Sequence, residues 1–330
     1  MKQLLLSTLL LIQVQVLLAQ SQPSTLPRMY FFVPNLLNPA MAGLEEEMTV
    51  SVLHQRQMTQ IAAGPQTQVF SINNGFAEYN TGLGINLFRD QNGPLSLTSA
   101  EGAFSYKVNY DKNEDGTSNH YVSFGLSAGI QLWQLNVKDL DAFNDDPVFM
   151  LQGESKPSLS ASFGMLYFYE GFQGGFSVQN IAGGRVRPLS AFDELVQEPT
   201  GFFLIGFENK LGENFRLNPL VVASLDFSGN IQADLNLIAE LDFDNGLGMS
   251  AGVGYRMASR YKESKPEGLM FYSKTEYKGF NLSVQYNYPT GNQGVFTGGE
   301  YTIGLGFTTA SFGGTKKTKK KPDESSGSEN

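Results

Sequence analysis

Long runs in which every second side chain is apolar constrain this chain more than any other feature. In residues 121–133 one face carries only apolar side chains, while the alternate positions are small or polar. The apolar set is Val122, Phe124, Leu126, Ala128, Ile130 and Leu132. The same alternation recurs in residues 231–243, 280–288 and 301–307. A period of two indicates β-strands with one apolar face.

The length of these runs separates a membrane barrel from a soluble sandwich. Strands of soluble sandwiches average about 5–6 residues, whereas a tilted strand that crosses a bilayer needs about 9–11. We therefore predict an all-β fold, an antiparallel transmembrane β-barrel of about fourteen strands, with twelve or sixteen as alternatives. The expected strands are 47–58, 66–74, 80–89, 95–110, 119–134, 157–169, 172–180, 200–211, 214–227, 230–242, 247–257, 268–277, 279–289 and 299–312.

The connections assign the two rims of this barrel. If the first strand runs outward, short turns fall on the periplasmic side and long loops fall outside, as is usual in outer-membrane barrels. The expected periplasmic turns are Glu170-Gly171, Gly212-Glu213, 244–246 and 278–279, and the expected outer loops are 135–156, 181–199, 258–267 and 289–298. The connections at 111–118 and 228–229 break this rule.

The N-terminus has the parts of a cleaved secretory signal. Lys2 is followed by an apolar run from Leu4 to Leu18 and then by the small residue Ala19. The run is shorter than the ~20 apolar residues of a transmembrane helix, which is the alternative reading. We expect a signal peptide at 1–19, a periplasmic or plug segment at 20–46, an outer-membrane barrel at 47–312 and a disordered Lys-rich tail at 313–330. That tail is either merely solvated or a docking segment for an acidic periplasmic partner.

Composition excludes several kinds of function. The chain has no cysteine and a net charge of -9, so thiol chemistry and nucleic-acid binding are not expected. Neither His54 nor His120 has a companion catalytic motif. Residues 111–116 match the first half of a calcium loop, but Val122 stands where its last ligand should be. We expect no enzyme activity, no cofactor and no metal.

Three short motifs carry a family resemblance. They are Asn35-Leu36-Leu37-Asn38-Pro39-Ala40-Met41-Ala42-Gly43, His54-Gln55-Arg56-Gln57-Met58 and Gly64-Pro65-Gln66-Thr67-Gln68. In this order they resemble the PorP/SprF family of type IX secretion system membrane proteins of Bacteroidetes. The resemblance assigns a binding role to the motif positions Asn35, Asn38, Pro39, Gly43, Arg56, Gln57, Gly64, Pro65 and Thr67.

The resemblance implies an accessory, non-enzymatic component of type IX secretion and gliding in the outer membrane. Family members bind the C-terminal domain of a secreted cargo, such as an adhesin, and assist its export or anchor it at the cell surface. Others connect with periplasmic or outer-membrane components of the secretion system. Outer loops can vary on a rigid barrel, so we expect cargo contacts at Asp141, Asp145, Asp146, Arg185 and Arg187.

The segment around Pro34 and Pro39 cannot join the sheet, so we expect it inside the barrel or against its periplasmic mouth. Arg56 would then pair with carboxylates in the lumen and hold the segment there. The main alternative function is an outer-membrane diffusion channel or small-solute transporter, because the sequence leaves the lumen open or filled. A secreted soluble β protein, such as an adhesin, is a second alternative.

Overall fold

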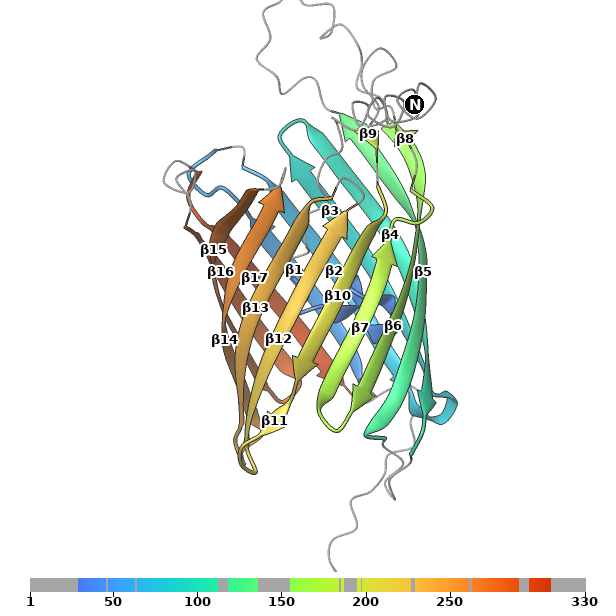
Figure 1. The fold of residues 1–330 in the computed structure, drawn as a ribbon, viewed down its shortest axis with the longest axis vertical. Helices are drawn as coiled ribbons and strands as arrows, with labels where there is room; N and C mark the ends of the chain where they lie inside the picture. The colour runs from blue at the N-terminus through green and yellow to red at the C-terminus, as the bar shows by residue number, and fades with distance from the viewer. Residues whose placement is uncertain are drawn as a thin grey trace, which may run out of the picture.

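Fourteen long antiparallel strands close into a single barrel, as predicted (Figure 1). The structure, a computed structural model, describes residues 29–45, 47–62, 64–111, 118–135, 155–183, 185–186, 195–196, 198–226, 229–260, 263–290 and 297–309. The barrel strands are β1 (Met48–Arg56), β2 (Gln66–Phe76), β3 (Thr81–Asn92), β4 (Leu95–Asn109), β5 (His120–Leu135), β6 (Ser155–Tyr169), β7 (Phe172–Gln179), β10 (Thr200–Phe207), β12 (Phe215–Asp226), β13 (Ile231–Asp242), β14 (Leu247–Arg260), β15 (Glu263–Tyr277), β16 (Phe280–Pro289) and β17 (Glu300–Thr309). Pairing of β1 with β17 completes the ring.

Of three further short strands, two form a separate pair and one extends the barrel sheet. Strands β8 (Arg185–Val186) and β9 (Leu195–Val196) pair with each other in the connection between β7 and β10. Strand β11 (Asn209–Lys210) continues the line of β10 and pairs with β12.

The apolar faces of the strands point outward and the small or polar faces point into the lumen. On β5, Leu126 and Ile130 are each 60% exposed, whereas Ser127 and Gln131 between and beside them are buried. An outward apolar face contacts lipid, and the closed ladder leaves no backbone edge unpaired in the hydrocarbon. The alternation read from the sequence is therefore the division between lipid and lumen.

The two rims differ in the length of their connections. Met48 pairs with Thr309, so the barrel begins and ends on one rim, which also carries the tight turns at Glu170-Gly171 and Lys278-Gly279. We assign this rim to the periplasm, since periplasmic turns of such barrels are short. The opposite, outer rim carries the long connections after β5, β7 and β16.

Most of one expected outer loop is strand in the described part of the chain. Residues 258–267 were predicted to form a long connection, but β14 continues to Arg260 and β15 starts at Glu263. The pairing of β14 with β15 shifts its register between Arg256 and Met257. Strands that rise above the bilayer into water carry polar side chains at no cost, so polarity there does not indicate a loop.

Candidate functional site

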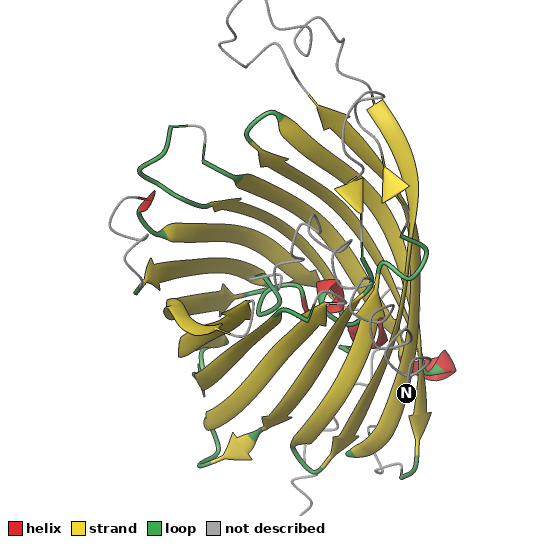
Figure 2. Cartoon of the chain, turned by 45° about the horizontal axis from the view of Figure 1, so that its top comes forward, coloured by secondary structure: helices red, strands yellow, loops and turns green. Residues whose placement is uncertain are grey.

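Residues 29–43, which we call the plug, lie inside the barrel (Figure 2). The plug contains two single 3-10 turns, η2 (Pro34–Leu36) and η3 (Pro39–Met41), each started by a proline at its first position. Proline has no N–H to donate and its fixed φ suits the first position of a helical turn. The backbone N–H of Ala40 donates to the Asn38 side chain, which caps η3.

Strands β3 to β7 face the plug with serine and glycine, and we call this surface the serine–glycine wall. Its serine hydroxyls donate to plug carbonyls: Ser105 to Ala42 at 2.6 Å, Ser123 to Ala40 at 2.7 Å and Ser177 to Leu37 at 2.6 Å. The Gln179 amide donates to the carbonyls of Leu36 and Leu37 at 2.6 and 2.9 Å. These bonds satisfy backbone acceptors that no helix or sheet would otherwise satisfy.

Two glycines of this wall allow the plug to approach closely. A Cβ added at Gly125 would collide with the backbone of Pro39 and Ala40, and one added at Gly164 would collide with the Asn38 side chain. Asn38 in turn donates to the carbonyls of Met165 and Phe176 at 3.0 and 3.2 Å. The wall therefore fits the plug backbone itself.

Strands β10 to β15 face the plug with large side chains, and we call this surface the apolar wall. Phe202, Leu204, Leu220, Val222 and Tyr272 form one buried cluster there together with Tyr30, Leu37 and Ala40 of the plug. The Phe31 ring stacks on Tyr272 with ring centroids 4.4 Å apart. Burial of apolar surface stabilises this side by roughly 1.5–3 kcal/mol for each large side chain.

A buried ion pair completes the apolar wall. Arg256 on β14 lies opposite Asp234 on β13 and donates to both carboxylate oxygens, at 2.6 and 2.5 Å. The exposed fractions of these side chains are 2% and 0%. The Tyr30 hydroxyl of the plug donates to Asp234 at 3.0 Å and accepts from Asn236 at 3.0 Å.

Arg256 and Arg216, not Arg56, contact carboxylates on the lumen face of β13, so the prediction for Arg56 was wrong. Arg56 lies at the outer end of β1 and donates to the Ala62 carbonyl at 3.1 Å, and the described residues give it no ion pair. The inward alternation of β13 and β14 carries the signal that was missed, because it sets a carboxylate and a guanidinium on adjacent strands. Choosing between the two arginines required the strand register.

The other motif residues build a hairpin at the outer rim between β1 and β2. Gln57 donates its backbone N–H to the Pro65 carbonyl at 2.8 Å, and Gly64 donates to Ile61 at 3.0 Å. The Thr67 hydroxyl donates to Asp90 on β3 at 2.6 Å.

This hairpin is also joined to the connection between β16 and β17. The backbone N–H groups of Thr59 and Gln60 donate to the carbonyls of Gly299 and Thr297 at 3.2 and 3.1 Å. Met58 and Ile61 are each 40% exposed beside these bonds. The outer rim thus has an ordered corner that carries apolar side chains.

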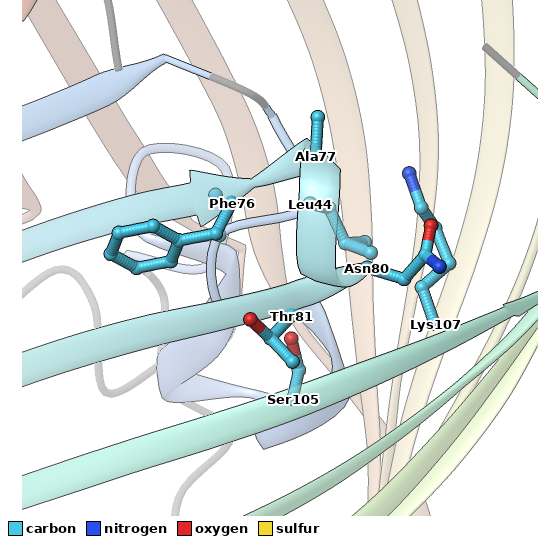
Figure 3. A pocket seen from close by; sticks show the side chains of 9 residues that line it. Leu44, Phe76, Ala77, Asn80, Thr81, Ser105 and Lys107 are labelled. Carbon is cyan, nitrogen blue, oxygen red and sulfur yellow. The ribbon is translucent and has the colours of Figure 1, made fainter. Parts of the chain in front are cut away.

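A small recess remains at the periplasmic end, where the plug leaves the lumen. It is lined by Gly43, Leu44, Phe76, Asn80 and Lys107, among others. Figure 3 shows the Leu44 side chain next to Asn80, with Lys107 beyond. The recess is the seam between plug and wall, since Ser105 on its lining already bonds to Ala42.

Carboxylates gather on the same rim. Glu47 directly precedes β1, and its partial burial, with Glu45 and Glu276 nearby, raises the pKa of its carboxyl above the ordinary value. Arg216 on β12 pairs with Glu240 and Asp242 at 2.9 and 2.7 Å.

Most of the predicted cargo-contact residues lie outside the part of the chain that the structure describes. Asp141, Asp145, Asp146 and Arg187 lie outside the described residues, and Arg185 is placed only by the backbone of β8. The described part of the chain holds no group of His, Asp and Glu arranged to bind a metal ion. It also contains no helix long and apolar enough to cross a membrane.

A family model described as type IX secretion system membrane protein PorP/SprF matches residues 19–307. The chain belongs to the PorP/SprF family. A comparison with curated proteins finds no match.

Solved structures similar to this PorP/SprF barrel include other barrels. The CymD monoaromatic hydrocarbon channel is 12% identical with a TM-score of 0.53, and the match covers 84% of this chain and 92% of CymD. A FadL homologue of Pseudomonas aeruginosa is 9% identical with a TM-score of 0.47, covering 83% and 92%. The likeness to CymD shows the barrel fold alone, and the PorP/SprF protein is an outer-membrane protein.

The motifs that carry the PorP/SprF resemblance lie in two places. Asn35, Asn38, Pro39 and Gly43 are in the plug, whereas Arg56, Gln57, Gly64, Pro65 and Thr67 are in the outer hairpin. The family is one of secretion-system membrane proteins and CymD is a channel, and neither description is that of an enzyme.

Proposed function

We propose that this PorP/SprF barrel binds the C-terminal domain of a secreted cargo, such as an adhesin, on its outer rim. It assists the cargo's export or anchors it at the cell surface, as a non-enzymatic part of type IX secretion and gliding. Periplasmic or outer-membrane components of the secretion system are its further partners.

The plug is the observation that carries this proposal. It contacts the wall on nearly every side, from Leu53 and Val69 through the serine–glycine wall to Phe202 and Tyr272. A lumen filled in this way gives a rigid support and a poor path for solutes. Outer loops on such a support can be varied for recognition without disturbing the membrane span.

Cargo capture would use the outer loops and the ordered corner beside them. The carboxylates of Asp141, Asp145 and Asp146 and the guanidinium groups of Arg185 and Arg187 offer charge of both signs. Exposed Met58 and Ile61 offer apolar area at the centre of a contact, where most binding energy is concentrated.

The decisive experiment is affinity purification of the barrel from native outer membranes, with identification of the proteins that remain bound. A D141N/D145N/D146N variant should retain at least tenfold less cargo than the wild-type barrel, and the cells should release cargo into the medium. The matched control, Asp244→Asn in a periplasmic turn, should retain it. Equal retention by both variants would remove these loops from the proposal.

Planar-bilayer recording separates the anchor from a diffusion channel. The purified barrel should give no steady conductance, because the plug occupies the lumen. A steady open current from the wild-type protein would favour the channel instead.

A further inference from the structure

Two arginines interrupt the otherwise uncharged, lipid-facing surface of the barrel. Among the described side chains of the fourteen barrel strands, Arg56 on β1 and Arg89 on β3 are the only Arg, Lys, Asp or Glu that point outward. Glu267, at the register shift of β15, accepts from the amide of Gln232 on the lumen face. A charge on the lipid face of a barrel is costly at mid-membrane and least costly near the interfaces.

The strand register brings the two arginines together near the outer rim. Strand β2 lies between β1 and β3, and its Gln66 pairs with Arg56 while its Gln68 pairs with both Arg89 and His54. These five side chains share the outward face of three adjacent strands, and we call them the cationic patch. Strand spacing and rise per residue place the Cα atoms of the two arginines about 12 Å apart.

The cationic patch lies at the boundary between hydrocarbon and lipid headgroups. The next outward row toward the periplasm is apolar and consists of Val52, Phe70 and Leu87 on the same three strands. On the neighbouring strand β17, Arg56 pairs with Tyr301, and outward tyrosines mark the headgroup level of a membrane barrel. A lipid whose chains lie against the apolar row therefore has its headgroup at the level of the arginines.

The described part of the protein supplies no counter-charge to this patch. Neither arginine has a carboxylate partner among the described residues, and Asp90, the sequence neighbour of Arg89, alternates into the lumen and accepts from Thr67. On the opposite side of the ring, the outward residues at the outer ends of β12 and β13 are the exposed Leu225 and Ile231. The outer rim is thus cationic on one side only, which favours an anionic molecule at that side.

We propose that the cationic patch binds the phosphate groups of a phosphorylated glycolipid in the outer leaflet of the membrane. The guanidinium groups of Arg56 and Arg89 donate to phosphate oxygens, a pairing that suits their planar, forked geometry. The amides of Gln66 and Gln68 between them donate to further headgroup oxygens, and the lipid chains cover the apolar row below. This site lies beside the hairpin between β1 and β2, and it does not depend on cargo binding.

The test is the affinity of the purified barrel, in micelles of an uncharged detergent, for diphosphorylated lipid A, measured by native mass spectrometry. Each of Arg56→Gln and Arg89→Gln should weaken binding about fivefold, and the double variant about thirtyfold. The matched control, Lys210→Gln/Lys278→Gln, removes two positive charges from the periplasmic rim and should bind lipid A as the wild type does. Lipid A without its phosphates should bind the wild-type barrel as weakly as diphosphorylated lipid A binds the double variant.

Equal affinity of the wild type and the double variant, or equal binding of the two forms of lipid A, would overturn the proposal. Full competition by inorganic phosphate would also overturn it, because the site would then take a soluble anion. Unchanged lipid binding together with lost cargo retention in Arg56→Gln/Arg89→Gln would identify the patch as a cargo contact instead. Heat-dependent gel migration checks that each variant is folded, and it should not change in detergent alone, where the lipid is missing.

Discussion

The serine–glycine wall and the apolar wall hold the same plug with different chemistry. The first, on β3 to β7, binds plug carbonyls through Ser105, Ser123 and Ser177 and leaves room for the backbone at Gly125. The second, on β10 to β15, binds plug side chains through apolar packing and the Asp234–Arg256 pair. The serine–glycine wall contacts the plug backbone, whereas the apolar wall contacts particular plug side chains. The substitutions below separate these contributions.

Replacement of Asp234 by Leu should have the largest effect. It removes the carboxylate that pairs with the buried Arg256 guanidinium, and breaking such a pair typically costs about 3–5 kcal/mol. The measurement is the denaturant midpoint of the barrel in micelles, followed through Trp133. The double variant Asp234→Leu/Arg256→Met should recover most of the loss, and a double variant as unstable as the single one would contradict the ion-pair account.

Gly125→Val should come next, at about 3 kcal/mol, because its side chain meets plug backbone that cannot rotate away. The expected readout is a lower temperature for the heat-dependent shift in gel migration. Gly102→Val, on the face of β4 that points away from the lumen, is the matched control, since a Cβ there meets nothing nearby. Similar losses at both positions would mean that strand propensity, not the plug, decides the cost.

Ser177→Ala should cost about 1 kcal/mol, the usual worth of one hydrogen bond. Ser123→Ala should behave alike and add to it, because the two bonds reach different carbonyls. Denaturant midpoints of the two single variants and the double variant provide the check. A change near zero for all three would show that water replaces the serines and that packing alone fixes the plug on this side.

Arg56→Gln should have the smallest effect, below about 0.5 kcal/mol, since Arg56 only donates to a loop carbonyl at the outer rim. The same substitution at Arg256 should be several-fold more costly. Unfolding midpoints measured side by side test this ranking, and a larger loss at Arg56 would restore the role that the sequence assigned to it.

The strand ladder was predictable because each strand has lipid on one side and the lumen on the other, so the period of two survives along its whole length. The same reasoning failed at residues 258–267, where β14 continues to Arg260 and β15 begins at Glu263, because polar residues and a proline in the sequence do not by themselves distinguish strand from loop. Barrel closure was predictable as well, since an open edge cannot face lipid.

The site was less predictable because it depends on pairings between distant residues. The prolines excluded residues 34–39 from the sheet but did not decide between lumen and mouth. A usable signal lay in Phe202–Ile205, which is apolar on both faces and therefore has apolar surface to bury inside a polar lumen as well. The segment that covers this apolar surface, and the pairing of Asp234 with Arg256, follow only from the strand register.

The position of the plug in the chain has a consequence for biogenesis. It is translated before every strand, and its wall contacts in chain order begin with Leu53 on β1 and Val69 on β2 and continue along the serine–glycine wall on β3 to β7. Pairing of β1 with β17 joins the most distant segments and carries the greatest loop-closure entropy. The plug can therefore template the curvature of the growing sheet, and the ring is sealed around it as the final step of insertion.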